Sequence, residues 1–249
     1  MTYSIVARDP ETGEFGVGVA SRFFAVGALV PHIRPAAAVA TQAFVNPLWG
    51  VEGAERIAAG EAPAQVLADF LARDAGAPQR QWHALDAQGR IAAHTGAECV
   101  DWAGHAAGED VSVAGNMLAG PGVIEAALAA WRAAPGLPMA DRLLAAMRAA
   151  EAAGGDRRGR QSAAIRVHDG EVYPRLDLRV DDHGAPLDEL ARLLAVARER
   201  FTLFSANMGR AAAFSGETDR RPLDAALARL EAERAARGET TRSHAADPD

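Results

Sequence analysis

The feature that most constrains the fold is a hairpin at the start of the chain. Two extended runs, Thr2–Ala7 and Phe15–Ala20, flank the turn sequence Asp-Pro-Glu-Thr-Gly at 9–13. Pro10 supplies the fixed φ of a tight turn, and Gly13 gives the backbone the freedom to leave it. The second run must therefore return beside the first, and the sheet begins with antiparallel neighbours.

The hairpin places Ser21 and Arg22 beside Thr2. If Met1 is removed, Thr2 carries a free α-amine next to its own hydroxyl, so a nucleophile and a base lie in one residue. An α-amine has a pKa of about 8, and its unprotonated fraction can accept the hydroxyl proton directly or through one water. We therefore predict that Thr2 is a catalytic nucleophile. The alternative is an ordinary threonine that follows a start codon.

The rest of the chain alternates strands with pairs of helices. Strands are expected at Ala36–Gln42, Gln81–Leu85, Arg90–Thr95, Asp110–Gly115, Ser162–His168 and Leu176–Val180, and helices at 51–60, 63–73, 123–134, 139–153 and 186–198. Strands that arrive as hairpins favour antiparallel sheets over a parallel βαβ sheet. Small apolar residues on both faces of Val17–Ala20 and Ala36–Ala40 indicate burial between two layers. We therefore expect an α+β fold, with two sheets packed face to face and helices outside.

Composition divides the chain near residue 209. We expect residues 1–208 to form one domain. Residues 209–249 are charged and rich in alanine, with one weakly amphipathic helix around Leu223, Leu227 and Leu230. The last dozen residues have the composition of a disordered tail.

What the sequence lacks excludes several kinds of chemistry. All 26 basic residues are arginine, which excludes Schiff-base chemistry, a Ser-Lys dyad and a P-loop lysine. The single cysteine excludes an internal disulfide and a multi-thiolate metal site. His83, His94 and His105 lack the short spacing of a metal motif. We therefore expect no metal and no cofactor.

Charge and hydropathy narrow the range of partners. The formal net charge of −7 argues against a nucleic-acid or anionic-membrane surface. The sequence has no apolar run long enough to span a membrane and no secretory signal pattern. We expect a cytoplasmic protein with no nucleic-acid or membrane partner.

The predicted catalytic residues are Thr2, Ser21 and Asn116. Ser21 is expected to hydrogen-bond with Thr2 across the hairpin. Asn116 follows a strand and is the first candidate for donating a hydrogen bond to an oxyanion, ahead of main-chain N–H groups near Ser21. The alternative for Asn116 is a turn-forming asparagine.

Further polar residues are candidates for binding substrate. They are Arg22, Thr41, Gln42, Asn46, Asp156 and Arg157. Thr41, Gln42 and Asn46 lie at the end of a predicted strand. Asp156 and Arg157 lie in the glycine- and arginine-rich segment 154–160, where an arginine fork can bind a carboxylate with two hydrogen bonds. Internal ion pairs, or a dimer contact, are the alternative for this segment.

Five motifs carry a resemblance to a known family. They are Thr-Tyr-Ser-Ile-Val-Ala-Arg-Asp-Pro (2–10), Ala-Thr-Gln-Ala-Phe-Val-Asn-Pro (40–47), Ala-His-Thr-Gly (93–96), Gly-Asn-Met-Leu-Ala-Gly (115–120) and Gly-Gly-Asp-Arg-Arg-Gly-Arg-Gln-Ser-Ala-Ala (154–164). Over residue 2 to about residue 205 the chain resembles the bacterial domain of unknown function 1028 family. That family is grouped by fold with the N-terminal-nucleophile hydrolases.

The resemblance implies a four-layer αββα sandwich of two antiparallel sheets and cleavage of an amide bond by a processed N-terminal residue. It implies no substrate. The sequence departs from the more distant proteasome β-type subunits, whose catalytic lysine has no counterpart here, since Arg22 is the only nearby cation and cannot act as a base.

Two functions follow as hypotheses. The first is an N-terminal-threonine amidohydrolase that cleaves a C–N bond of a small-molecule amide or short peptide. The second is a catalytically inactive binding or assembly protein on the same scaffold. In both cases we expect a homodimer or a higher homo-oligomer.

Overall fold

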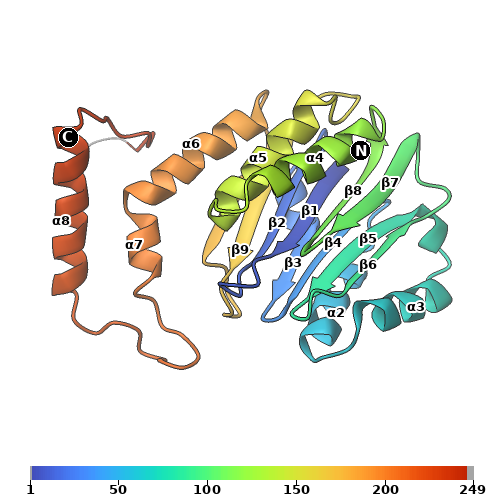
Figure 1. Cartoon of the computed structure of the whole chain (residues 1–249), viewed down its shortest axis with the longest axis horizontal. Coiled ribbons are helices and arrows are strands. Elements are labelled where there is room, and N and C mark those ends of the chain that lie inside the picture. Colours follow the sequence, from blue (N-terminus) through green and yellow to red (C-terminus); the bar gives the residue numbers. More distant parts are fainter. Residues whose placement is uncertain (1, 246–249) are drawn as a thin grey trace. The chain divides into compact units, whose positions relative to one another are not determined.

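The computed structural model describes residues 2–245 and contains two antiparallel sheets (Figure 1). The first has six strands in the order β10-β9-β2-β1-β8-β7. They are β1 (Thr2–Arg8), β2 (Phe15–Ser21), β7 (Trp102–Gly108), β8 (Val111–Leu118), β9 (Ser162–His168) and β10 (Leu176–Val180). The second has four strands in the order β3-β4-β5-β6. They are β3 (Pro31–Arg34), β4 (Ala37–Ala43), β5 (Arg80–Asp86) and β6 (Ile91–Thr95).

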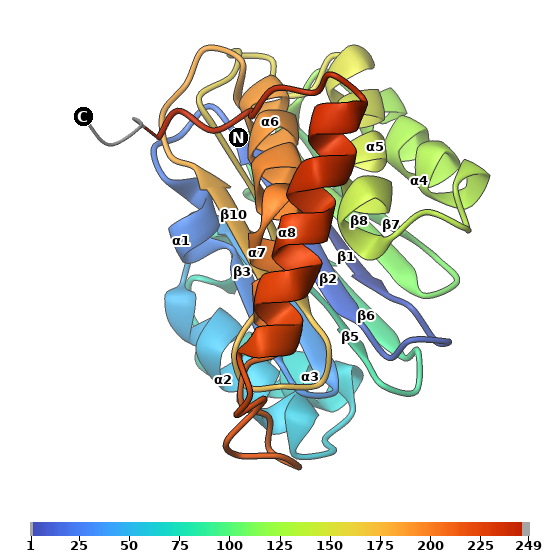
Figure 2. The ribbon, with the colours of Figure 1, turned by 90° about the vertical axis from the view of Figure 1, so that its left-hand side faces the viewer.

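Helices cover the outer face of each sheet (Figure 2). The six-stranded sheet carries α4 (Gly122–Ala133) and α5 (Met139–Ala152), and the four-stranded sheet carries α2 (Pro47–Ala58) and α3 (Pro63–Arg73). The inner faces of the two sheets pack against each other through a buried apolar cluster that includes Val17, Val19, Ala38 and Leu85. The expected α+β fold, a four-layer αββα sandwich of two antiparallel sheets, is confirmed.

Strand β1 shows how alternate residues serve the two faces of the first sheet. The Tyr3 hydroxyl donates to the main-chain oxygen of Met147 in α5, at 3.1 Å. The next side chain, Ser4, points the other way and bonds to His83 of β5 at 2.8 Å. Because side chains alternate along a strand, Thr2 lies on the same inner face as Ser4.

Several strands and helices differ from expectation. Strands β3 and β7 were not expected; both are edge strands, and β7 is rich in alanine and glycine rather than in β-branched residues. Helix α2 begins at Pro47 rather than at 51, because the Asn46 side chain accepts a hydrogen bond from the N–H of Leu48 at 3.1 Å and caps the helix. Strand β8 continues past Gly115 to Leu118, so Asn116 lies inside the strand.

A short helix, α1 (Val26–Leu29), packs directly on β9. Its contact depends on Gly27, because a Cβ built on this glycine would lie 2.5 Å from the Cβ of Ala164. Ser162 holds the same segment: its hydroxyl donates to the main-chain oxygen of Phe23 at 2.5 Å and accepts from the N–H of Val26 at 3.2 Å. The residues around α1 are therefore fixed against the first sheet.

The chain divides into two compact units between Leu187 and Asp188, ahead of the composition change at Gly209. The remaining helices are α6 (Pro186–Glu199), α7 (Phe201–Ser205) and α8 (Arg221–Ala236). Helix α8 is the helix expected around Leu223. Part of the expected disordered tail, 246–249, lies outside the described residues. Across residues 2–245, no helix is both long enough and apolar enough to cross a membrane.

His83 is buried in the interface between the sheets. Its Nε2 atom bonds to the Ser4 hydroxyl at 2.8 Å and its Nδ1 atom to the Ser112 hydroxyl at 2.9 Å. Burial lowers the pKa of His83 to about 3, with a smaller contribution from His105. The imidazole is therefore neutral in the folded protein, and it links one hydroxyl on β1 to another on β8.

This burial predicts a pH-dependent loss of stability. The pKa of His83 is lower in the folded protein than in the unfolded chain, so stabilisation by the neutral ring is complete above pH 6.5 and falls as the pH decreases toward 3. Burial lowers the pKa values of His32, His105 and His168 in the same direction. We expect His83→Gln to flatten the dependence of unfolding free energy on pH between 6.5 and about 4.5, above the range in which most carboxylates titrate. Urea titrations at several pH values measure the unfolding free energy. If its slope against pH is the same in the variant, His83 is not the group that titrates.

The contact of α1 predicts a compensating pair of substitutions. Gly27→Ala brings two Cβ atoms into conflict and should destabilise the protein by about 1–3 kcal/mol, despite the better helix propensity of alanine. Ala164→Gly in the same chain removes the conflict and should restore most of the loss. Gly122→Ala is the matched control on α4, since a Cβ built on Gly122 would meet no atom within 4 Å outside its own helix. Urea unfolding measures all four proteins, and a double variant no more stable than Gly27→Ala would argue against this contact.

Candidate active site

Four polar side chains form a row across one end of the six-stranded sheet. Thr2 on β1 pairs with Asn116 on β8 and with Ser21 on β2, and Ser21 pairs with Ser162 on β9. Residues that pair directly across an antiparallel ladder present their side chains to the same face. The register therefore brings the three predicted catalytic residues together and adds Ser162 to them.

The hydroxyl of Thr2 is held in the interior. Its Oγ1 atom lies 3.1 Å from the Oγ atom of Ser21, and either can donate. Thr2 is 7% exposed, and Ser21 and Asn116 are buried as well. Thr2 thus occupies a defined position with a fixed hydroxyl partner.

Next to this row, three side-chain amides form a buried cluster centred on Gln81. The Nε2 atom of Gln81 donates to the main-chain oxygens of Gly115 at 2.8 Å and Gly104 at 3.0 Å. Its Oε1 atom accepts from Asn116 Nδ2 at 3.0 Å and from Gln42 Nε2 at 2.8 Å. The cluster therefore joins β4 and β5 of one sheet to β8 of the other, and it fixes the amide of Asn116 beside Thr2.

One atom of this cluster lacks a partner. Gln42 is 1% exposed, and its Oε1 atom is buried without a hydrogen-bond partner among the residues that the structure describes. Leaving a buried acceptor unpaired costs about 1–3 kcal/mol, so such groups are rare in folded proteins. Gln42 is therefore the member of the cluster whose side-chain oxygen is left without a hydrogen bond.

A cavity of about 90 Å³ lies beside Thr2. Its lining consists of Thr2, Phe23, Val26, Leu29, Val30, Gln42, Ala43 and Val45. Of these lining residues only Thr2 and Gln42 have polar side chains, and the other walls are apolar. The predicted nucleophile and one member of the amide cluster thus line the same small cavity.

Backbone strain is found beside two of these residues. Ala43, which follows Gln42, has φ 70°, and Met117, which follows Asn116, has φ 55°. Left-handed φ values in residues other than glycine cost of order 1–3 kcal/mol each and gather at functional sites. Both strained residues directly follow an amide of the cluster, so the backbone changes direction immediately after Gln42 and after Asn116.

The arginine-rich segment folds against the end of β2. Asp156 accepts hydrogen bonds from the main-chain N–H groups of Arg22 and Arg158, at 2.7 and 2.8 Å. The Arg22 guanidinium donates to the main-chain oxygen of Arg158 at 2.7 Å, and Arg157 forms an ion pair with Asp101 at 3.2 Å. These contacts include an internal ion pair and fix the strand end that carries Ser21, and substrate binding by Asp156 and Arg157 stays a prediction.

Two substrate-binding candidates lie elsewhere. Thr41 donates to the main-chain oxygen of Asn46 at 3.3 Å, and Asn46 caps α2 and donates to Asp74 at 3.2 Å. Neither residue is among those that line the cavity beside Thr2. Their contacts organise the loop between β4 and α2.

Sequence reasoning missed Gln81 and Ser162. Ser162 gave no local signal, because its place in the row depends on the pairing of β2 with β9 across a long stretch of chain. Gln81 begins a strand that the sequence predicts, but its position opposite Gln42 became visible only in the structure.

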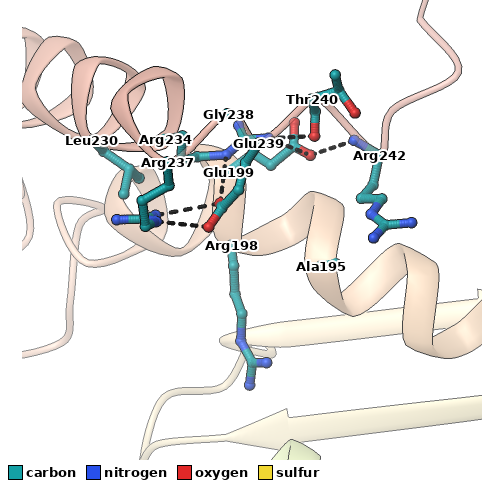
Figure 3. A pocket seen from close by; sticks show the side chains of 10 residues that line it. All are labelled: Ala195, Arg198, Glu199, Leu230, Arg234, Arg237, Gly238, Glu239, Thr240 and Arg242. Carbon is teal, nitrogen blue, oxygen red and sulfur yellow. Dashed lines mark hydrogen bonds and ion pairs between the residues drawn. The ribbon is translucent and has the colours of Figure 1, made fainter.

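Two other cavities differ from the one beside Thr2. One of about 230 Å³ adjoins Ser21 and is lined by Tyr3 and by residues of the segment 154–160. Another, of about 550 Å³, lies within the second unit between α6, α8 and the chain after α8 (Figure 3). There Glu199 accepts from Arg234 at 3.1 Å and from the N–H of Arg242 at 2.6 Å. The Glu199 carboxylate is therefore paired with a neighbouring arginine of the same cavity. In the described part of the chain, no group of three His, Cys, Asp or Glu side chains is arranged to hold a metal.

Comparison with known proteins agrees with the fold. The chain matches a family described as a family of unknown function, DUF1028, over residues 2–190. It is similar to the crystal structure of a DUF1028 protein from Silicibacter pomeroyi, with 31% sequence identity, coverage of 88% of this chain and 99% of that chain, and a TM-score of 0.81. No curated protein matches the sequence significantly. Because the match extends over most of the chain, this protein belongs to the DUF1028 family.

Proposed function

We propose that the protein is an N-terminal-threonine hydrolase of the N-terminal-nucleophile type, which cleaves the C–N bond of a small-molecule amide or short peptide. The observation that carries the proposal is the position of Thr2. Its hydroxyl lies between the two sheets, hydrogen-bonded to Ser21, and it lines a cavity. Removal of Met1 would place an α-amine on the same residue.

The reaction would proceed through an ester on Thr2. The α-amine accepts the hydroxyl proton while Oγ1 attacks the substrate carbonyl carbon and forms a C–O bond. The C–N bond then breaks, and the departing amine takes the proton from the α-ammonium. Water attacks the ester, its proton passes through the α-amine to Oγ1, and the acid is released with Thr2 restored. No lysine is required, because the base belongs to the nucleophile itself.

Ser21 and Asn116 would support this step in different ways. Ser21 orients the Thr2 hydroxyl, at 3.1 Å. Asn116 Nδ2 uses one hydrogen for Gln81, and its second hydrogen can donate to the oxyanion that forms on the substrate. Arg22 and Asp156 would act indirectly, by fixing the strand end that carries Ser21.

The proposal includes a small-molecule substrate and assembly with further copies of the same chain. The substrate is a small molecule, and the cavity of about 90 Å³ beside Thr2 limits the size of the part that lies there. The active form is proposed to be a homodimer or a higher homo-oligomer. Gel filtration with light scattering tests the assembly.

The proposed nucleophile can be tested by acylation. Protein from which Met1 has been removed should react with para-nitrophenyl acetate in a burst, with the acetyl group on the peptide that begins at Thr2. Thr2→Ala should abolish this label, Thr2→Ser should retain it, and protein that keeps Met1 should be unreactive. Intact-mass measurement and peptide mapping determine both processing and label. If processed protein is unlabelled, or the label lies elsewhere, the inactive binding or assembly protein becomes the better account.

The proposed oxyanion donor, Asn116, can be tested in the same way. Asn116→Ala should slow acylation of Thr2 by ~100-fold or more. The fold should persist, since Gln42 still donates to the same Gln81 oxygen. Ser112→Ala is the matched control on the same strand: it removes a buried hydroxyl away from Thr2 and should leave the acylation rate unchanged. Equal rates for Asn116→Ala and the unmodified protein would remove Asn116 from the mechanism.

A further inference from the structure

The cavity beside Thr2 differs from the rest of the candidate site in its polarity. Apart from Thr2 and Gln42, the described residues that line it have apolar side chains, and none is charged; they are Phe23, Val26, Leu29, Val30, Ala43 and Val45. A charged group that enters such surroundings without a partner is strongly disfavoured. The cavity therefore favours an uncharged, apolar group.

The lining connects the surface of the protein with its interior. Phe23 is 55% exposed, and Leu29 and Val45 are partly exposed. Val26 and Val30, by contrast, belong to the buried apolar cluster between the sheets. A group that arrives from solvent can thus be received beside Thr2 without opening of the core.

The wall formed by α1 is held in place by the first sheet. Gly27 allows close packing on Ala164, and the Ser162 hydroxyl bonds to the main chain of Phe23 and of Val26. The volume of about 90 Å³ therefore limits the size of the occupant. At about 30 Å³ per water molecule in the liquid, there is room for about three groups of the size of a methyl or methylene.

We propose that this cavity is a substrate subsite that receives an aliphatic group of about three carbon atoms, attached to the scissile carbonyl on its acyl side, while that carbonyl lies at the Thr2 hydroxyl. The substrate class is an amide of a short-chain aliphatic acid, or a short peptide with a small aliphatic side chain, such as that of valine, before the cleaved bond. The orientation toward Thr2 rests on the proposed function. The preference of the cavity for a short apolar group does not.

The acyl side is assigned from the order of the proposed steps. The amine leaves first and water must take its place, so the amine requires an open path to solvent. The acyl part stays attached to Thr2 through both steps. A small cavity with fixed walls therefore suits the acyl part, because the same contacts then hold the carbonyl in place for both attacks.

A series of esters that differ in chain length tests the subsite. Protein without Met1 is treated with the para-nitrophenyl esters of acetic, butyric and hexanoic acid, and each rate of acylation of Thr2 is divided by the rate at which hydroxide hydrolyses the same ester. Each buried methylene contributes about fourfold, so the butyrate ester should acylate Thr2 roughly fifteenfold faster than the acetate ester. The hexanoate ester should be no faster than butyrate, because its chain exceeds the room available.

Variants of the wall should change this order. Leu29→Ala removes three carbon atoms from the lining and should make hexanoate the fastest ester, and Val45→Ala, on a different segment, should also raise the hexanoate rate relative to butyrate. Leu71→Ala is the matched control, because this leucine of α3 is 41% exposed and does not line the cavity. It should leave the order of the three esters unchanged. Thermal unfolding of each variant verifies that the fold is kept.

Binding to the Thr2→Ala protein tests the subsite without catalysis. Butyramide should shift the NMR signals of the methyl groups of Val26, Val30 and Val45, and it should bind roughly fifteenfold more tightly than acetamide. The subsite is overturned if butyramide leaves these signals unchanged, if acetamide binds equally well, or if Leu29→Ala and Leu71→Ala give the same order of esters.

The two assays separate the subsite from the proposed function. Binding of butyramide at the three valines without acylation of Thr2 would support the preference of the cavity for a short apolar group and remove the hydrolase. Acylation of Thr2 at equal rates by all three esters, without binding of butyramide, would support the hydrolase and remove the subsite.

Discussion

The structure depends on the pairing of strand β1 along both of its edges. Its first described residue, Thr2, is in register with Ser21 on one side and Asn116 on the other. A shift of the register by one residue would turn every side chain of β1 to the opposite face, which would put Tyr3 between the sheets and Thr2 under the helices. The position of the Thr2 hydroxyl is therefore fixed by the same hydrogen bonds that form the sheet.

Burial of this strand end requires polar side chains between the sheets to satisfy one another. The Ser4–His83–Ser112 bonds and the Gln81 cluster both connect a strand of one sheet to a strand of the other. Fully bonded buried networks fix one arrangement, whereas an unbonded member is destabilising. Within the described residues that member is Gln42 Oε1. Gln42, the residue that carries this atom, also lines the cavity beside Thr2.

Local signals predicted much of the fold, and long-range contacts account for what they missed. The opening hairpin was predictable because Pro10 and Gly13 specify its turn within a few residues, and the pairing of Thr2 with Ser21 followed from it. Asn116 was expected after a strand but lies within β8, since Met117 continues the strand at φ 55°. No local pattern could reveal that Gln81 connects two sheets, or that Ser162 stands beside Ser21.

The contrast between local and long-range contacts explains why Asn46 and Gln42 differ in role, although both are amides near the end of one strand. Asn46 directly precedes Pro47, which favours the first turn of a helix, and its side chain is used as the cap of α2. Gln42 still lies within β4, where its direction is set by the pleat and by Gln81.

The small cavity owes its shape to the segment that carries α1. Ala25, before this helix, has φ 52°, and its main-chain N–H donates to the oxygen of Asp181 at 3.0 Å. A non-glycine residue keeps such a conformation only where its surroundings determine it. Ser162 supplies two more hydrogen bonds to this segment. The wall formed by Val26 and Leu29 is therefore held by the sheet itself, so the limit on what can lie beside Thr2 is built into the fold and does not depend on a ligand to create it.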